Sequence, residues 1–251
     1  MRLRDKVILV TGGGSGIGAA SCLAFAREGA KVAVVNRSPA KAEAVAQSIA
    51  DSGGTAVAVQ ADVSRAADVE RMIERTVSQL GVPNVLFNNA GISPSGPVGD
   101  ISEADWDECL NINLKSVFLC VKASIPLMIE AGGGCILNTA GSFGIRAAKN
   151  KAAYSVAKAG VINLTRSIAL DYAHDRIRCN VICPGYVDTP LNEGFPPSER
   201  DAFLAGYQPL PGLISADDVA EMAVYLASDA ARMVTGQIFV IDGGQQAGLF
   251  A

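Results

Sequence analysis

The sequence is poor in charge, in aromatic residues and, above all, in histidine. Charged residues make up 18% of the 251 residues and aromatic residues 6%, and His174 is the only histidine. A serine-histidine-aspartate nucleophile system would depend on that residue, which lies in an Ala-His-Asp-Arg segment typical of a helix-end turn. The formal net charge of -4 gives no electrostatic argument for binding nucleic acid or an anionic membrane surface. We therefore expect neither a histidine-based hydrolase nor a nucleic-acid-binding protein.

Long apolar runs are missing as well. No run approaches the roughly eighteen residues of a membrane-spanning helix, so no membrane partner is expected. The first residues lead into only four apolar ones, Val7 to Val10, which is too short for a signal-peptide core and favours a cytoplasmic location. Hydrophobic residues nevertheless make up 49% of the chain, which favours a sheet buried on both faces.

The cysteines do not form an evident metal-binding or disulfide pattern. They stand at positions 22, 109, 120, 135, 179 and 183. Cys179 and Cys183 are four residues apart in an expected strand, so they share one of its faces. A metal-binding or redox role for this pair is therefore an alternative. Without further ligands at metal spacing, the pattern favours buried thiols that pack as small hydrophobic groups.

Short apolar runs alternate with helical patterns along the whole chain. The predicted strands cover residues 6–10, 31–35, 56–60, 85–87, 135–139, 177–183 and 237–241. Helical patterns between them include residues 17–28, 40–50, 152–172 and 217–228. With no internal repeat and no linker, this alternation predicts one α/β domain, residues 1–251, with seven parallel strands and helices on both faces.

Two helical segments carry further expectations. Ser102 and Asp105 have the spacing of a capping box, at the start of one long helix that carries Asn111, Asn113 and Lys115. Residues 190–214 are rich in proline, glycine and aromatic residues, which predicts a mobile substrate lid with a short helix near Glu199 to Leu204.

A glycine cluster lies between the first strand and the first helix. The segment Thr11 to Gly18 places glycines at 12, 16 and 18, and Ile17 occupies the position of the last glycine in G-x-G-x-x-G. Glycines in this context let the backbone approach a pyrophosphate, and the helix N-terminus supplies N–H donors. The cluster therefore predicts a dinucleotide cradle, with a merely flexible turn as the alternative.

The residues after the second strand bear on the choice of dinucleotide. Asn36 and Arg37 stand where an acidic residue would accept a hydrogen bond from the adenosine ribose. A guanidinium binds phosphate in a bidentate way, so Arg37 favours NADP over NAD, and Ser15 could add a hydroxyl donor; Arg37 could instead point to solvent. Asp62 either binds the adenine amino group or, like Ser64, caps the next helix.

Tyr154 and Lys158 are spaced to share one face of a helix. They are four residues apart, and a lysine cation near a phenol would lower its pKa and make a general acid/base pair. Ser142, twelve residues earlier, follows a strand and could reach the phenol across the intervening loop. A surface tyrosine with a solvated lysine is the alternative, and Asn113 fits a structural hydrogen bond as well as a catalytic one.

Together these motifs resemble the short-chain dehydrogenase/reductase family, and in particular its 3-oxoacyl-carrier-protein reductase-like oxidoreductases. The resemblance spans the whole chain. It rests on the segments Thr11 to Gly18, Asp62-Val63, Asn88 to Gly91, Asn113-Leu114, Ser142, Tyr154 with Lys158, Pro184-Gly185 with Thr189, and Asp242 to Gly244. It implies a Rossmann-type fold and a single dinucleotide-binding catalytic domain.

The resemblance also implies roles for individual residues. Tyr154 would exchange a proton with the carbonyl oxygen, Lys158 would lower the tyrosine pKa and hold the nicotinamide ribose, and Ser142 would hydrogen-bond the substrate. Asn113 would anchor a water that relays protons to Lys158. The implied cofactor-binding residues are Gly12, Ser15, Ile17, Gly18, Arg37, Asp62, Val63, Asn89, Ala90, Gly91, Tyr154, Lys158, Pro184, Gly185, Val187 and Thr189.

The expected reaction is the reversible reduction of a ketone to a secondary alcohol, with NADP(H) preferred over NAD(H). Ser15 departs from the basic residue that NADP-preferring relatives often carry at that position. An NAD-dependent sugar, polyol or alcohol dehydrogenase is the alternative, and a non-catalytic nucleotide-binding module is a more distant one. The resemblance implies a homotetramer, or a dimer, in which long helices pack pairwise. Small residues on one face of the helix from Ala152 suit such packing.

Several apolar residues could line the substrate pocket and favour an uncharged or acyl-type ketone. They are Ile92, Pro94, Phe143, Ile145, Tyr186, Phe195 and Phe203. Arg146 and Lys149 lie near its expected mouth, where they either bind an acidic substrate or are solvated, and the solvated surface role is favoured.

Overall fold

One seven-stranded sheet forms the centre of the computed structural model, which describes residues 1–193 and 196–248. Its strand order is β3-β2-β1-β4-β5-β6-β7, and every neighbouring pair is parallel. The strands are β1 (Val7–Thr11), β2 (Lys31–Asn36), β3 (Thr55–Gln60), β4 (Val85–Asn88), β5 (Gly134–Thr139), β6 (Ile177–Pro184) and β7 (Ile238–Ile241). All seven predicted strands are present, and the predicted parallel α/β fold is confirmed.

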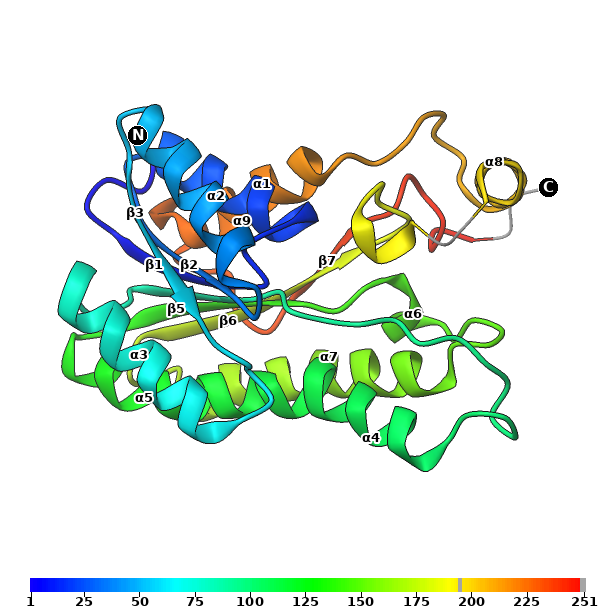
Figure 1. The fold of residues 1–251 in the computed structure, drawn as a ribbon, viewed down its shortest axis with the longest axis horizontal. Coiled ribbons are helices and arrows are strands. Elements are labelled where there is room, and N and C mark those ends of the chain that lie inside the picture. Colours follow the sequence, from blue (N-terminus) through cyan, green and yellow to red (C-terminus); the bar gives the residue numbers. More distant parts are fainter. Residues whose placement is uncertain (194–195, 249–251) are drawn as a thin grey trace.

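Helices cover both faces of the sheet (Figure 1). One layer contains α1 (Gly16–Arg27), α2 (Pro39–Asp51) and α9 (Ala216–Ala227). The other contains α3 (Ala66–Leu80), α4 (Glu103–Leu110), α5 (Ser116–Glu130) and α7 (Ala152–Asp171). The short α6 (Ser142–Ile145) and α8 (Pro197–Tyr207) lie toward one end of the molecule.

The two-residue period of the strands divides the core in two. Ile8 and Val10 of β1 belong to the apolar cluster beneath α1 and α9, whereas Leu9 belongs to the cluster beneath α3, α5 and α7. Phe87 of β4 and its neighbour Leu86 divide between the two clusters in the same way. The strands are apolar throughout because both of their faces are covered.

The capping box predicted at Ser102 is only half present. The Ser102 hydroxyl accepts a hydrogen bond from the Asp105 N–H at 3.1 Å, as a helix N-cap does, and donates to the Asp105 carboxylate at 2.7 Å. The reciprocal bond from Asp105 to the Ser102 backbone is not formed. A complete capping box occurs instead at Ser215 and Asp218, at the start of α9.

The single long helix expected from Ser102 onward is interrupted. A π-helical turn, Asn111–Lys115, separates α4 from α5. The Asn113 side-chain amide donates to the Cys109 carbonyl oxygen at 3.0 Å, so it competes with the helical backbone for this acceptor. By length and hydropathy the stretch Glu103–Glu130 would pass as a membrane span, but 44% of its most apolar window is buried within the protein, as in a core helix.

The lid predicted at residues 190–214 contains more helix than expected. A 3₁₀ turn, Pro190–Asn192, is followed by α8, which includes the predicted short helix near Glu199 to Leu204 and extends beyond both of its ends. The segment after α8 is tied to the C-terminal turn, because the Leu210 N–H donates to the Gly243 carbonyl oxygen at 2.9 Å. Whether this segment moves as a lid stays a prediction.

The strand order places a crevice where the chain reverses direction across the sheet. From β1 the chain moves outward through β2 to β3 and then returns to β4, on the other side of β1. In such sheets the connections that follow the two strands at the reversal lead away in opposite directions, and ligands bind in the crevice between these loops. The glycine cluster follows β1 and the segment Asn88 to Gly91 follows β4, so both flank this position.

Candidate active site

A cleft of about 1260 Å³ lies over the carboxyl ends of the strands. It gathers nearly all of the predicted site residues, from segments far apart in the sequence. Those that line it are Gly12, Ser15, Ile17, Arg37, Asp62, Val63, Asn89, Ala90, Gly91, Asn113, Ser142, Tyr154, Lys158, Pro184, Gly185, Val187 and Thr189. Gly18 is the exception and does not line the cleft.

The glycine cluster forms a cradle that side chains would fill. Gly12 and Gly16 have φ angles of +66° and +51°, and a Cβ on Gly12 would lie 2.9 Å from the Cα atom of Ala90. Gly18 has a packing role instead, since its Cβ would lie 2.1 Å from the Gly12 carbonyl oxygen. Ser15 is the N-cap of α1 but makes no capping hydrogen bond, so the first-turn N–H groups have no side-chain partner. These features fit the pyrophosphate of a dinucleotide.

Two cations lie at the end of the cleft next to the turn after β2, where the sequence predicts the adenosine of a dinucleotide. Arg37 and Lys41 both line it, and a Cβ on Gly14 would lie 2.8 Å from both the Asn36 amide nitrogen and the Lys41 Cβ. The side-chain oxygen of Asn36 accepts a hydrogen bond from the Ser38 N–H at 2.9 Å, which closes the turn after β2. Lys41 was not anticipated from the sequence, although it stands only four residues beyond Arg37.

Asp62 does not cap the following helix. Its carboxylate accepts from the Ser64 hydroxyl at 2.6 Å and from the Ser64 N–H at 3.0 Å, whereas Arg65 is the N-cap of α3. The capping alternative for Asp62 and Ser64 is therefore wrong. Burial alone would raise the pKa of Asp62, but the Ser64 hydrogen bonds and the charges of Arg65 and Arg37 outweigh it and lower that pKa.

Hydrogen bonds fix the strand ends beneath the cleft. The Thr11 hydroxyl at the end of β1 accepts from the N–H groups of Asn89 at 3.0 Å and Ala90 at 3.2 Å. The Thr139 hydroxyl at the end of β5 donates to the Asn89 side-chain oxygen at 3.3 Å. A Cβ on Gly91 would lie 2.7 Å from the Asn113 side-chain oxygen, so no larger residue fits there without displacement.

Tyr154 and Lys158 share one face of α7, as predicted. The Lys158 ammonium is 3% exposed, donates to the Thr139 carbonyl oxygen at 2.8 Å and lies 5.7 Å from the centroid of the Tyr154 ring. The Tyr154 hydroxyl donates to the Ala140 carbonyl oxygen over a long 3.4 Å. The pair is therefore a built feature of the cleft and not a surface tyrosine with a solvated lysine.

Burial shifts the pKa values of both groups of this pair. Burial raises the pKa of the Tyr154 phenol above its ordinary value, and burial lowers the pKa of Lys158 to about 8. The expectation that Lys158 lowers the tyrosine pKa stays a prediction, since burial sets the direction of both shifts. Desolvation disfavours the charged form of each group, the phenolate of Tyr154 and the ammonium of Lys158.

Ser142 and Asn113 complete the predicted set. Ser142 is 4% exposed and begins α6 directly after Gly141, whose φ is +133° and whose Cβ would lie 3.2 Å from the Tyr154 hydroxyl oxygen. Asn113 is fully buried, and its amide donates to the Ile92 carbonyl oxygen at 2.9 Å and accepts from the Ile92 N–H at 3.2 Å. The structural hydrogen bonds of Asn113 are thus observed, whereas its water relay stays a prediction.

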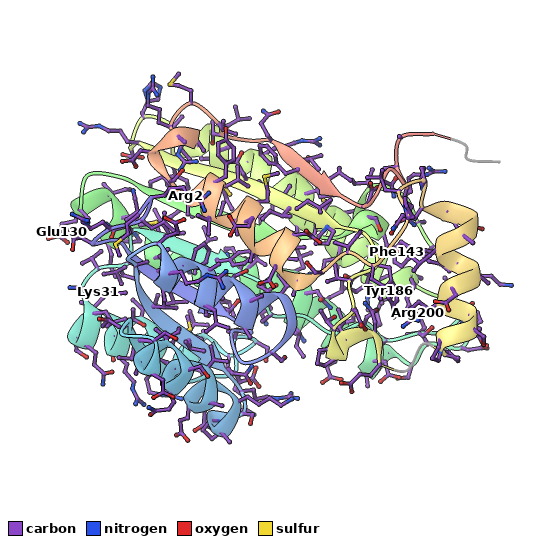
Figure 2. The ribbon with its side chains drawn as sticks, turned by 90° about the horizontal axis from the view of Figure 1, so that it is seen from above. Arg2, Lys31, Glu130, Phe143, Tyr186 and Arg200 are labelled. Carbon is purple, nitrogen blue, oxygen red and sulfur yellow. The ribbon has the colours of Figure 1, made fainter. Side chains whose placement is uncertain are left out.

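The substrate end of the cleft is partly as expected. Ile92, Phe143, Tyr186 and Phe203 line it, together with Arg146 and Lys149. Pro94 and Ile145 do not, since Ile145 turns outward and is 39% exposed; Phe195 lies outside the described residues. Figure 2 shows Phe143, Tyr186 and Arg200 gathered near α8, at the end of the molecule opposite Lys31.

Lys151 and Gln246 also line the cleft and were missed from the sequence. Gln246 lies in the C-terminal turn, and its side-chain amide donates to the Ser142 carbonyl oxygen at 3.3 Å, across 104 residues.

The six cysteines are buried and free. Cys179 and Cys183 both belong to one apolar cluster, as the packing interpretation predicted.

Known proteins share both the sequence and the shape of this chain. Residues 12–246 match a sequence family described as enoyl-(acyl carrier protein) reductase. The chain is 41% identical over 244 residues to cis-4-hydroxycyclohexanecarboxylate dehydrogenase of Sinomonas cyclohexanicum, across 97% of both chains. It is 41% identical over 250 residues to dehydrogenase/reductase SDR family member 6 of Rattus norvegicus, across 97% of this chain and 98% of the relative. The structure of levodione reductase superposes with a TM-score of 0.93 at 35% identity, across 98% of this chain and 100% of that one.

Proposed function

Because the chain belongs to the short-chain dehydrogenase/reductase family, we propose that it reduces a ketone reversibly to a secondary alcohol, with Tyr154 as the acid/base and NADPH as the preferred reductant. Family membership makes it an oxidoreductase that acts on alcohol or carbonyl groups. The observation that carries the finer proposal is the Tyr154 hydroxyl beside Gly141 and Ser142, in the same cleft as the glycine cradle.

In this proposal the chain's own residues bind the ketone and move its proton. The hydroxyls of Ser142 and Tyr154 hold the carbonyl oxygen, and the Tyr154 proton passes to that oxygen as the carbonyl carbon is reduced. NADPH, held along the glycine cradle, supplies the hydride when bound. Lys158 holds the nicotinamide ribose, and Asn113 anchors the water that returns a proton toward Lys158. In the oxidation direction the Tyr154 phenolate takes the proton from the alcohol.

The raised pKa of Tyr154 fits the reductive direction. A phenol whose pKa lies above its ordinary value stays protonated near neutral pH, which is the form that donates a proton. Alcohol oxidation needs the phenolate, so its rate should rise with pH while the reduction rate stays level near neutrality. Half-buried apolar side chains at Ile92 and Phe143 line the cleft and favour a substrate with an apolar ring or chain.

The cofactor preference rests on charge at the adenosine end. No acidic residue follows β2, so nothing there would repel a 2′-phosphate, while Arg37 and Lys41 line that end of the cleft. Ser15 lies at the same end and adds a hydroxyl. A guanidinium and an ammonium together suit the two negative charges of the phosphate.

The proposed assembly is a homotetramer, in which α4, α5 and α7 pack against a second copy. Large apolar side chains are exposed on this face, with Phe118 at 47%, Val156 at 50% and Leu170 at 79%. Gly160 of α7 leaves room for Leu114 of the same chain, 2.8 Å from where a Cβ would lie, and both residues line a hollow on this face.

Replacement of Tyr154 by Phe tests the proposed acid. Tyr154→Phe removes only the hydroxyl, so NADPH-dependent reduction of cyclohexanone should fall at least about a thousandfold, while the NADPH dissociation constant changes less than about threefold. Absorbance of NADPH gives the first value and its fluorescence on binding gives the second. Tyr225→Phe, on the opposite face of the sheet, is the matched control and should retain wild-type rates. Retained turnover in Tyr154→Phe would refute the proposal.

A further inference from the structure

The cleft is positive although the protein is acidic. The formal net charge is -4, yet the described lining residues include six cations and two carboxylates. The cations are Arg37, Lys41, Arg146, Lys149, Lys151 and Lys158, and the carboxylates are Asp62 and Glu199. Arg37 and Lys41 serve the adenosine end and Lys158 the reacting centre. The remaining three, Arg146, Lys149 and Lys151, have no assigned role and are here called the cation subsite.

Lys151 is held by two side-chain hydrogen bonds in the cation subsite. It is half-buried, and its ammonium donates to the Ser93 carbonyl oxygen at 3.1 Å and to the Ser93 hydroxyl at 3.0 Å. An ammonium has three N–H donors, so one remains for a ligand. Both partners are neutral oxygens, and within residues 1–193 and 196–248 no carboxylate forms an ion pair with Lys151. The charge of Lys151 is therefore held in place without being neutralised.

The backbone around Lys151 is fixed as firmly as its side chain. Gly96 and Lys151 form a parallel β-bridge, and the Asn150 carbonyl oxygen accepts from the Gly96 N–H at 2.9 Å and from the Ser95 hydroxyl at 3.3 Å. Asn150 adopts a φ of +61°, a conformation that asparagine tolerates better than most residues. These contacts join the loop after β4 to the loop before α7 and pre-organise the cation subsite.

The cation subsite lies close to the reacting centre. Lys151 is the N-cap of α7, three residues before Tyr154, which is about 4.5 Å along a helix axis. Lys151, Tyr154 and Lys158 all line the cleft, and they come from the N-cap and the first two turns of α7. One small molecule can therefore reach both the Tyr154 hydroxyl and the Lys151 ammonium.

The surroundings of the cation subsite favour an anion. Arg146 and Lys149 are exposed on the same loop, and neither forms an ion pair within the described part of the chain. The first turn of α7 has no acidic residue and no side-chain cap, so its positive dipole end is not compensated. Among the described residues, Glu199 of α8 is the one acidic group that lines this end, and it is exposed.

We propose that the cation subsite binds a carboxylate carried by the substrate, at a distance from the carbonyl that Tyr154 protonates. Lys151 makes the direct charge-assisted hydrogen bond, and Arg146 and Lys149 add attraction at the rim. This inference rests on the proposed function and narrows its substrate class to hydroxy or keto carboxylic acids of small size. It replaces the solvated surface role favoured for Arg146 and Lys149 from the sequence.

The test compares two ketones that differ only in charge. With 4-oxocyclohexanecarboxylate and 4-oxocyclohexanecarboxamide as probes, kcat/KM should favour the carboxylate at least about tenfold, the range of one charge-assisted hydrogen bond. In Lys151→Met and in the Arg146→Gln/Lys149→Gln double variant, this ratio should fall toward one. Lys31→Gln removes an exposed cation at the opposite end of the molecule (Figure 2) and should leave the ratio unchanged. A ratio near one in the wild type, or one that both variants retain, overturns the proposal.

Binding of unreactive analogues separates this inference from the proposed function. Calorimetry with cyclohexanecarboxylate and cyclohexanecarboxamide, on protein saturated with NADPH, should show the same preference and its loss in the variants. If the analogues discriminate but neither ketone is reduced, the cation subsite stands and the proposed function fails. If both ketones are reduced equally through Tyr154, the proposed function stands and the cation subsite fails. Should Lys151→Met not fold, the double variant on the exposed rim still decides the outcome.

Discussion

Lys158 is a buried ammonium whose hydrogen-bond partner is a neutral carbonyl oxygen. Its burial lowers its pKa to about 8, from an ordinary value of 10.5, so the folded protein holds this proton less tightly than the unfolded chain does. Between these two pKa values the unfolded chain binds more protons, and stability therefore rises with pH across this window. A lysine that is buried with only a neutral hydrogen-bond partner has a strongly shifted pKa, which is typical of a functional residue and not of a structural one.

This linkage predicts a pH-dependent stability difference. Between pH 7 and pH 9.5, the free energy of unfolding of the wild type should rise by about 2 kcal/mol relative to Lys158→Met, without nucleotide. Urea denaturation of both proteins across that range measures the difference. Lys31→Met, which replaces an exposed lysine, should show no such trend relative to wild type. A flat difference for Lys158→Met would mean that Lys158 ionises in the fold as it does in water.

The junction between β2 and α2 should determine the preference for NADPH over NADH. Asn36 uses its side-chain oxygen to close the turn, and Arg37 follows with its side chain lining the cleft. Lys41 lies in the first turn of α2, so the residue after a strand and the start of a helix both contribute a cation to the cleft. The two cations reach the same cleft because a turn joins β2 to α2. Within a strand, successive side chains would point to opposite faces of the sheet.

Removing these two cations should change the cofactor preference. Arg37→Ala/Lys41→Ala should raise the KM for NADPH at least about tenfold and the KM for NADH less than about threefold, because only NADPH carries the 2′-phosphate. Steady-state kinetics with each cofactor measures both values. Arg27→Ala, at the exposed end of α1, is the matched control and should leave both unchanged. A wild type that uses NADH as well as NADPH would show the NADP assignment to be wrong.

At the scale of the whole molecule, one helical face remains exposed and apolar. A hollow of about 550 Å³ lies between α4, α5 and α7, and its lining includes Leu110, Leu114, Phe118 and Leu164. Apolar side chains gathered on one face in this way are typical of a protein interface. α7 also carries Tyr154 and Lys158, so association through this face would stiffen the helix that holds the proposed reacting groups.

Charge placed on this face should reduce the size of the assembly. Phe118→Glu should lower the solution mass from about four times 25.9 kDa to a smaller species, because a carboxylate there would be buried without a partner. Light scattering after size exclusion measures the mass. Val98→Glu changes a side chain that is 75% exposed outside this face and should leave the mass unaltered. A wild type that is monomeric at micromolar concentration would contradict the proposed tetramer.

The sequence alone determined the features that depend on local spacing. Apolar runs alternating with helical patterns determined a parallel sheet, because strands covered on both faces have to be apolar throughout. Gly12 and Gly16 marked the cradle, since the turn there needs positive φ angles. Tyr154 and Lys158 were placed on one face by helical periodicity, which needs no contact with the rest of the chain.

Only the tertiary structure decided the features that depend on distant contacts and burial. The π-helical turn at Asn113 arises from an amide that binds both Cys109 and Ile92, the latter 21 residues away. Lys151 becomes part of the cleft because Ser93, 58 residues earlier, holds its ammonium. The pKa values of Tyr154 and Lys158 follow from desolvation, a property of every atom packed around them and not of the residues themselves.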